Sequence, residues 1–502
     1  MKNEMIIMNN ITKLTENAYN HLDNGNVECA KKILTAMKEM EMTPELKYSM
    51  SSLLIEIGTA SENIDYIDEG IKNFEELKKE AKFEVDYNLG NGHSSKYKIM
   101  DNRPNYLTKE EHLLTKAKTH YLNAINNPLE QKNPQLYINL ANTYNYIGRT
   151  IDALEYYEKS PNHPYALINK GIGLCSYSTF IHNPTPLLKD AYECFKKVLK
   201  IENIPVEFIT ISNAHMKKIE EICGKKLLEK NDKKELKRPS NNTFEGFMTN
   251  FCLENKLYLN LCNFCQRCDN AIGDTLLMPD MLVEISTPLE ENPYLKLSSQ
   301  LNQIKLDYII SRFLLILSQS ETKLLNLISK NTILTETFSY EENNSSSQLL
   351  KNSVTGFYNI LDKISHLINI YFKLEKEPKN VTFHKVWYNN KGKIHGKLRS
   401  LNNLGLNALY DIHLELEPNY EKFYLRKMRN NLTHNFVPIK LVKLEDDDMT
   451  YDELRNNTLE LAKIVKNAII YLIRAIDINE RKRFEENKSK IIPKMNSKTI
   501  KL

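Results

Sequence analysis

The sequence predicts an all-α protein, for three reasons. Only 15 Gly and 17 Pro occur among 502 residues, so turn-forming residues are scarce. Leu, Lys and Glu are abundant, and these residues favour long helices over strands. Apolar residues also recur at intervals of three and four along much of the chain, which is the period of an amphipathic helix. Because a single core stops growing near about 250–300 residues, we expect more than one domain.

Composition and charge narrow the class of protein. A hydrophobic fraction of 41% and a charged fraction of 26% are usual for a globular chain, and the net charge of +4 permits a nucleic-acid partner without indicating one. Eight cysteines without a secretory segment at residues 1–8 predict the reducing cytoplasm rather than a disulfide framework. The most apolar run, 308–317, contains Arg312 and is much shorter than the roughly 20 residues that cross a bilayer, so no membrane partner is predicted.

Residues 1–223 are predicted to form pairs of amphipathic helices with small side chains at fixed offsets. In one copy Gly90 is on the first helix and Tyr121 on the second, and in another Gly171 is on the first and Phe195 on the second. A polar insertion at 91–108 is expected to break the period. The clearest copy consists of Tyr137, Leu140, Ala141, Tyr144, Ala153 and Tyr157. This spacing resembles the tetratricopeptide (TPR) repeat. The resemblance implies a solenoid whose concave face binds a protein or peptide; a generic helical bundle is the alternative.

Residues 224–297 are predicted to be a linker with connecting helices. Cys262, Cys265 and Cys268 lie three residues apart, and Cys252 is a possible fourth zinc ligand. Paired knuckles separated by a longer loop are absent from this stretch, so we expect buried or partly buried thiols rather than a metal centre. The sequence therefore predicts no metal and no cofactor, with these cysteines as weak candidates for zinc ligands.

Residues 298–478 are predicted to form an antiparallel helical bundle, followed by a basic tail at 479–502. Thr450 and Glu453 have the spacing of a capping box, and Pro418 ends an earlier helix. A stripe of Ile309, Phe313 and Ile316 is expected to be buried. One seam of apolar and aromatic residues recurs at intervals of three and four: Val354, Phe357, Leu361, Ile364, Ile368 and Tyr371. The tail could bind RNA or be disordered.

Between Leu425 and Phe436, the sequence combines groups suited to phosphodiester chemistry without a metal. Arg429 carries a permanent charge, Asn430 offers a carboxamide, and His434 exchanges a proton near neutral pH. On a helix, Asn430 and His434 lie one turn apart on the same face, while Arg429 is rotated by about 140° from His434. Arg426 and Lys427 are further candidates for phosphate contacts, with a solvated helix face as the alternative.

This stretch resembles the signature of the HEPN family of helical ribonucleases, in which Arg and a polar residue precede His by a short spacing. Residues 361–364, 381–383 and 403–410 also resemble a bacterial family in which TPR repeats are fused to a HEPN domain. The resemblance implies an endoribonuclease that cleaves RNA through its 2′-hydroxyl, with Arg429 on the phosphate, Asn430 as an orienting group and His434 as acid or base.

The resemblance also implies a homodimer or higher oligomer formed through the HEPN domain, which would bring two Arg/His sets together. It further suggests a toxin or effector in bacterial antiviral defence. The alternative function is a non-catalytic protein-binding adaptor that uses the helical bundle only for dimerisation.

Overall fold

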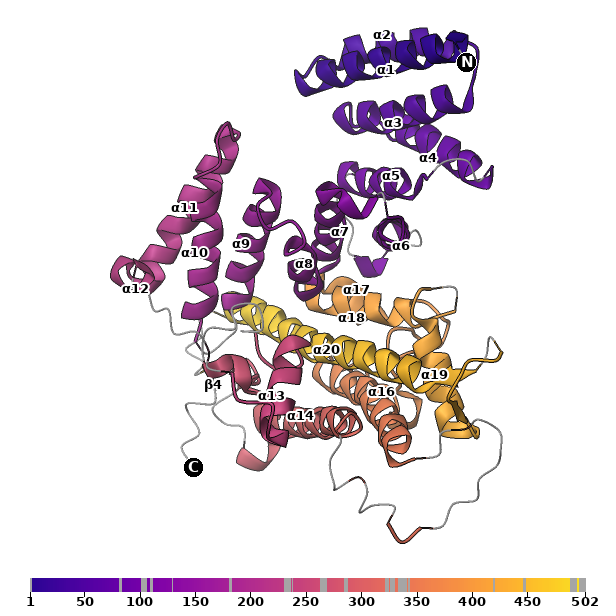
Figure 1. Cartoon of the computed structure of the whole chain (residues 1–502). Helices are drawn as coiled ribbons and strands as arrows, with labels where there is room; N and C mark the ends of the chain where they lie inside the picture. Colours follow the sequence, from indigo (N-terminus) through magenta and orange to yellow (C-terminus); the bar gives the residue numbers. More distant parts are fainter. Residues whose placement is uncertain are drawn as a thin grey trace. The chain divides into compact units, whose positions relative to one another are not determined.

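The computed structural model confirms the all-α prediction (Figure 1). It describes residues 2–80, 84–100, 106–108, 112–128, 130–179, 183–229, 236, 238–261, 269–283, 288–320, 325, 330–332, 341, 344–418, 420–445, 448–487 and 494–495. The chain divides into two compact units, Met1–Asn169 and Lys170–Leu502. Within the described ranges, no helix is both long enough and apolar enough to span a bilayer.

The first unit consists of successive helical hairpins. Helix α1 pairs with α2, α3 with α4, α5 with α6 and α7 with α8, and neighbouring hairpins pack through α3 on α1 and α2, α4 on α5, and α6 on α7. The helices are α1 (Lys2–Asp23), α2 (Val27–Lys38), α3 (Pro44–Ala60), α4 (Ile64–Lys79), α5 (Asp86–Ile99), α6 (Leu113–Ile125), α7 (Pro134–Ile147) and α8 (Thr150–Tyr157), with 3₁₀ turns at Tyr106–Thr108 and Glu130–Lys132.

Glycines allow close helix approach inside these hairpins. A Cβ atom added to Gly90 on α5 would lie 2.5 Å from Cε1 of Tyr121 on α6, so this crossing requires glycine. The predicted break at residue 91 is wrong, because α5 continues to Ile99. Gly92 keeps the helix against α4, where an added Cβ would lie 2.7 Å from Cγ1 of Ile71. The paired helices agree with the TPR assignment, which stays a prediction.

The second unit contains the C-terminal bundle, in which the long helix α20 packs against α16, α18 and α14 (Figure 1). Helix α16 also packs against α14 and α19. The helices, with α9 beginning in the first unit, are α9 (Pro164–Ser178), α10 (Thr185–Val198), α11 (Val206–Cys223), α12 (Lys225–Glu229), α13 (Phe244–Glu254), α14 (Pro293–Leu317), α16 (Ser345–Tyr371), α17 (Gly396–Ser400), α18 (Leu404–Glu415), α19 (Phe423–His434) and α20 (Tyr451–Glu486).

Short 3₁₀ turns and strands complete the second unit. The turns are Asp269–Ile272, Leu289–Glu291 and Pro378–Asn380. Strand β1 (Met281–Leu282) pairs antiparallel with β4 (Lys494–Met495), and β2 (Ile439–Lys440) pairs parallel with β3 (Met449–Thr450). The capping box of Thr450 and Glu453 is present at the start of α20.

The core of the bundle follows the predicted seam of α16. The seam residues Val354, Phe357, Leu361, Ile364 and Ile368 are all fully buried. By contrast, the expected burial of Phe313 is wrong: its side chain on α14 is 39% exposed and contacts the ring of Phe244 edge-on. Ile309 is only half-buried, so the buried stripe of α14 is narrower than its periodicity suggested, while Ile316 lies in the core.

Helix α18 is fixed against α20 by a polar cap and a glycine. The buried Asn403 side chain accepts hydrogen bonds from the amides of Gly405 and Leu406 and donates one to the carbonyl oxygen of Ala475, at 2.8 Å. A Cβ atom on Gly405 would lie 2.4 Å from the Ala475 nitrogen, so the two helices touch at backbone distance. This contact sets the position of the residues at the far end of α18.

Candidate functional site

Helix α19 carries the Arg/His stretch and is anchored to the bundle by few residues. Only Leu425 and Met428 are buried within it, and Lys422 at its N-cap makes no side-chain capping hydrogen bond. The Tyr424 hydroxyl donates to Glu460 on α20, and the Lys422 ammonium lies 3.3 Å from a carboxylate oxygen of Glu415. Most of the helix surface is therefore directed away from the core.

The three predicted catalytic residues lie on this helix as the spacing suggested. Asn430 and His434 are exposed, and the structure assigns His434 no hydrogen-bond partner among the described residues. Arg429 is half-buried, with its guanidinium 5.1 Å from the centroid of the Tyr358 ring and its Nη1 donating to Asn430 Oδ1 at 3.1 Å. Its Nε is buried and has no hydrogen-bond partner within the described part of the chain. The Tyr358 ring and Asn430 thus hold the Arg429 guanidinium in place on the same helix as the exposed His434.

The two additional basic candidates differ in their surroundings. Arg426 is engaged: its Nη1 lies 2.7 Å from Oε2 of Glu417. Lys427 is exposed on α19. A phosphate contact by Arg426 would therefore compete with an ion pair, which the sequence did not indicate.

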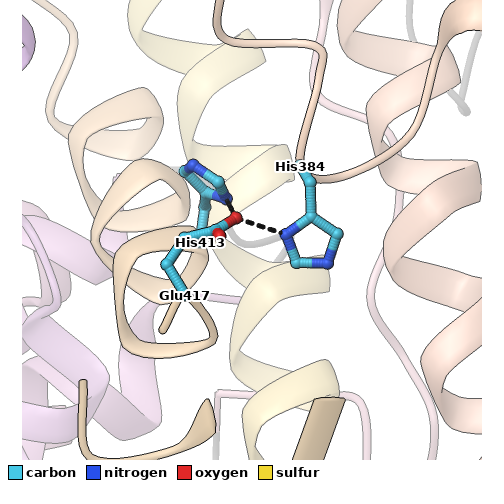
Figure 2. A group of neighbouring side chains, drawn as sticks. All are labelled: His384, His413 and Glu417. Atoms are coloured by element: carbon cyan, nitrogen blue, oxygen red, sulfur yellow. Dashed lines mark hydrogen bonds and ion pairs between the residues drawn. The ribbon is translucent and has the colours of Figure 1, made fainter. Parts of the chain in front are cut away.

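Next to Arg429, two histidines and a glutamate form a cluster that the sequence reasoning missed (Figure 2). We call His384, His413 and Glu417 the His/Glu cluster. Oε1 of Glu417 lies 2.7 Å from Nδ1 of His384 and 3.3 Å from Nδ1 of His413. The Nε2 atoms are held by tyrosines: His384 by the hydroxyl of Tyr358 at 2.6 Å, and His413 by that of Tyr388 at 2.9 Å.

Three elements bring the cluster together. His413 lies in the last turn of α18, and Glu417 follows one turn later, so both approach the same point. His384 comes from the loop after α16, which is fixed by two hydrogen bonds: the Phe383 amide donates to Asp362 Oδ1 at 2.9 Å, and the buried Trp387 indole donates to the Phe383 carbonyl at 2.8 Å. The Asp362 carboxylate on α16 therefore holds the backbone of the loop that carries His384.

Burial decides the protonation of the cluster. It lowers the pKa of His413 well below its ordinary value, and the neighbouring His384 and Arg426 act in the same direction. Burial and Arg426 also lower the pKa of His384, against the opposing effect of Glu417. Burial raises the pKa of the Tyr358 hydroxyl, which stays protonated. Near neutral pH, both imidazoles are thus neutral.

Tyr358 connects the two groups of side chains. Its ring lies under Arg429, and its hydroxyl contacts His384. Sequence offered one local signal for the cluster, the spacing of four between His413 and Glu417, whereas His384 is 29 residues before His413 and has no periodic relation to it. Only the packing of the loop on α18 reveals the third member.

The cysteine candidates and the basic tail are only partly described. Cys262, Cys265 and Cys268 lie outside the described residues. Cys252 is buried on α13, and burial raises the pKa of its thiol to about 11. In the region predicted as a tail, α20 continues to Glu486, with Arg481 paired to Asp477; residues 488–493 and 496–502 are outside the described part.

Residues 288–479 match the family model of the LA2681-like HEPN domain. This part of the chain is therefore similar to a HEPN-family domain. The match runs from the turn before α14 through most of α20 and includes the whole of α19 and the His/Glu cluster. No curated protein and no solved structure matches the chain. HEPN domains are commonly ribonucleases.

Proposed function

We propose that the HEPN domain is a metal-independent endoribonuclease whose catalytic residues are Arg429, Asn430 and His434. The observation that carries the proposal is their presentation on α19: an exposed imidazole lies one turn from an exposed carboxamide, which accepts a hydrogen bond from an arginine positioned over the Tyr358 ring. The HEPN match to this region supports RNA as the substrate.

The reaction proceeds by attack of the ribose 2′-oxygen on the adjacent phosphorus. One imidazole accepts the 2′-hydroxyl proton, the bond from phosphorus to the 5′-oxygen breaks, and a second imidazole donates a proton to that leaving oxygen. The Arg429 guanidinium binds the phosphate and stabilises the charge that develops on its oxygens. Asn430, which accepts a hydrogen bond from Arg429, orients the guanidinium. The products carry a 2′,3′-cyclic phosphate and a 5′-hydroxyl, and DNA is inert because it lacks the nucleophile.

Two imidazoles require two copies of α19. Each chain presents one exposed histidine on this helix, His434, whereas His384 and His413 are held by the Tyr358 and Tyr388 hydroxyls. We therefore propose a homodimer in which both His434 side chains flank one phosphodiester.

Exposed apolar residues directly after α19 support a second copy as the occupant of this surface. Phe436, Leu441, Val442 and Leu444 are all largely exposed within nine residues of chain. Apolar side chains gathered at one surface favour an association that removes them from water. A pairing that covers this loop would also bring the two α19 helices towards one another, because the loop begins where α19 ends.

For the first unit, we propose that its helical hairpins are TPR-like repeats that bind a protein or peptide partner. The role of a toxin or effector in bacterial defence rests on the family resemblance alone. The domain limits 1–223, 224–297, 298–478 and 479–502 are likewise proposed.

The deciding experiment incubates purified full-length chain with RNA in EDTA and compares the wild type with His434→Ala. We expect cleavage by the wild type to fall at least about 10²-fold in the variant, since a general acid or base contributes that much or more. His366→Ala, which changes a half-buried histidine of α16, is the matched control and should cleave normally. Equal cleavage by His434→Ala would refute the site.

The identity of the products tests the chemistry separately. Mass spectrometry should find 2′,3′-cyclic phosphate ends, and a substrate with a single 2′-deoxy sugar at the cut should resist cleavage. If the dimeric wild-type protein leaves RNA intact, the adaptor alternative takes precedence.

A further inference from the structure

The His/Glu cluster has three features that point beyond a network of hydrogen bonds: tyrosine hydroxyls at the outer nitrogens of both histidines, a buried nitrogen without a partner, and one carboxylate oxygen that lies close to both histidines. We propose that His384, His413 and Glu417 bind one divalent transition-metal ion, with Zn²⁺ as the best fit. This site is separate from the proposed nuclease residues on α19.

The ligand atoms are already gathered. One ligand atom from each of the three residues lies within 4.8 Å of the other two. Nδ1 of each histidine lies close to Oε1 of Glu417, at 2.7 Å for His384 and 3.3 Å for His413. In tetrahedral zinc sites with bonds of about 2.0–2.2 Å, ligand atoms are about 3.3 Å apart. The 3.3 Å distance between Glu417 and His413 fits this value, and the 2.7 Å distance to His384 would need to open by about half an ångström.

Both imidazoles are oriented as metal ligands usually are. A ligating histidine commonly donates its remaining ring N–H to a fixed acceptor, which sets the tautomer and directs the other nitrogen at the ion. The Tyr358 and Tyr388 hydroxyls are in place to accept from Nε2 of His384 and His413, at 2.6 and 2.9 Å. Nδ1 of each histidine lies towards Glu417 (Figure 2), and a metal ion would replace the hydrogen bond between Nδ1 of His384 and the carboxylate.

The second observation is an unpartnered nitrogen. The His413 side chain is 1% exposed, and its Nδ1 is buried without a hydrogen-bond partner in the described structure, although it lies close to the carboxylate. Buried polar atoms normally have a partner. A metal ion between Nδ1 and Oε1 would supply it, whereas a direct hydrogen bond does not have the required geometry here.

The charges favour a particular kind of ion and fourth ligand. Arg426 lies 2.7 Å from Oε2 of Glu417. The metal would therefore bind Oε1 and replace its hydrogen bond with Nδ1 of His384. Two imidazoles select Zn²⁺, Cu²⁺ or Ni²⁺ over Mg²⁺ and Ca²⁺, which prefer oxygen ligands. With Glu417 balanced by Arg426, the bound ion keeps a positive charge, so its open position would take an anionic ligand such as hydroxide or a phosphate oxygen.

The test measures metal binding by the intact chain rather than cleavage. After dialysis against a chelator, the protein is titrated with Zn²⁺ and, in a parallel sample, with Co²⁺ as a spectroscopic probe. We expect one equivalent that gives the visible absorption of tetrahedral cobalt without a thiolate charge-transfer band. Any ion bound by the cysteines of residues 262–268 would show that band and is thereby distinguished.

Substitutions assign the ion to the cluster. His384→Asn and Glu417→Gln should each lose one equivalent, while His366→Asn on α16 should keep it. Tyr388→Phe retains all three ligands and should bind about 10-fold more weakly, since partners of metal ligands typically contribute 10- to 100-fold. If His384→Asn fails to fold, Glu417→Gln decides the outcome.

Two results would overturn the site. One is a folded wild-type chain that takes up no ion with nitrogen and oxygen ligands, which would leave a cluster held by hydrogen bonds alone. The other is a cobalt spectrum unchanged by both His384→Asn and Glu417→Gln. Neither result depends on whether the protein cleaves RNA, so failure of this site and failure of the nuclease proposal are distinguishable.

Discussion

Mixing wild-type and His434→Ala chains tests whether two imidazoles act on one phosphodiester. Each copy of α19 presents one exposed histidine, so a mixed pair would contain either an acid or a base but not both. The two chains, distinguished by different affinity tags, are co-expressed or exchanged until pairing is random. Total protein concentration is held constant while the wild-type fraction is varied.

The expected magnitude follows from the pairing. In an equal mixture, about one quarter of the pairs are wild type and about one half are mixed. Because each imidazole role contributes about 10²–10⁴ in rate, a mixed pair retains no more than about one per cent of the activity. Cleavage should therefore fall to about one quarter and follow the square of the wild-type fraction.

The assay is the initial rate of cleavage of a fluorescent RNA, with size-exclusion chromatography to confirm that the mixed pairs form. An activity of about one half, linear in the wild-type fraction, would show that each chain cuts alone. An activity of about three quarters of the wild-type value would mean that one His434 per dimer is sufficient for cleavage. Either outcome refutes the arrangement of two histidines around one linkage.

Three further perturbations test the site and the fold. Arg429→Lys keeps the charge but loses the planar stacking, so cleavage should fall about 10²-fold with thermal stability unchanged, and full activity would contradict the role of the guanidinium. Burial lowers the pKa of His93 to about 3. Because the pKa of His93 in the folded state is below its unfolded value of 6.5, the unfolded chain binds a proton at His93 first as the pH falls. The free energy of unfolding therefore decreases below pH 6.5. Between pH 7 and pH 5, the wild type should lose about 2 kcal/mol more than His93→Gln in urea titrations, and equal losses would refute this. Gly171→Ala places a Cβ 2.7 Å from Cζ of Phe195 and should lower the unfolding free energy by about 1–3 kcal/mol, whereas Gly396→Ala meets no atom within 4 Å and serves as the neutral control.

The helices could be predicted because their signals are local. The seam of α16 and the capping box of α20 each depend on residues within a few turns, and both appear in the structure. The exposure of Phe313 could not be predicted, since it depends on which neighbours cover α14 rather than on the residues of α14 itself. The continuation of α5 past residue 91 was missed for the same reason: Gly92 is held by a contact with another helix.

The candidate site shows a similar division. The placement of Asn430 and His434 on one helical face followed from their spacing, whereas the rotation of Arg429 predicted only that it lies on a different face from His434. The contact of Arg429 with the Tyr358 ring did not follow, because Tyr358 lies on another segment and no periodic pattern connects it to α19. The same holds for His384, which contacts the Tyr358 hydroxyl. Contacts between distant segments therefore decide the surroundings of the site.

Helix α19 has only 12 residues, no side-chain cap at its start and two buried anchors, Leu425 and Met428. Isolated helices of that length are marginal in water. A synthetic peptide covering the stretch should consequently be unstructured and catalytically inert. Substitution of either anchor would make the positions of the reactive side chains variable, although none of those side chains is itself changed. The surrounding bundle thus keeps this segment helical and ordered. A substitution in the supporting residues would therefore lower activity in the same way as a substitution of a reactive residue.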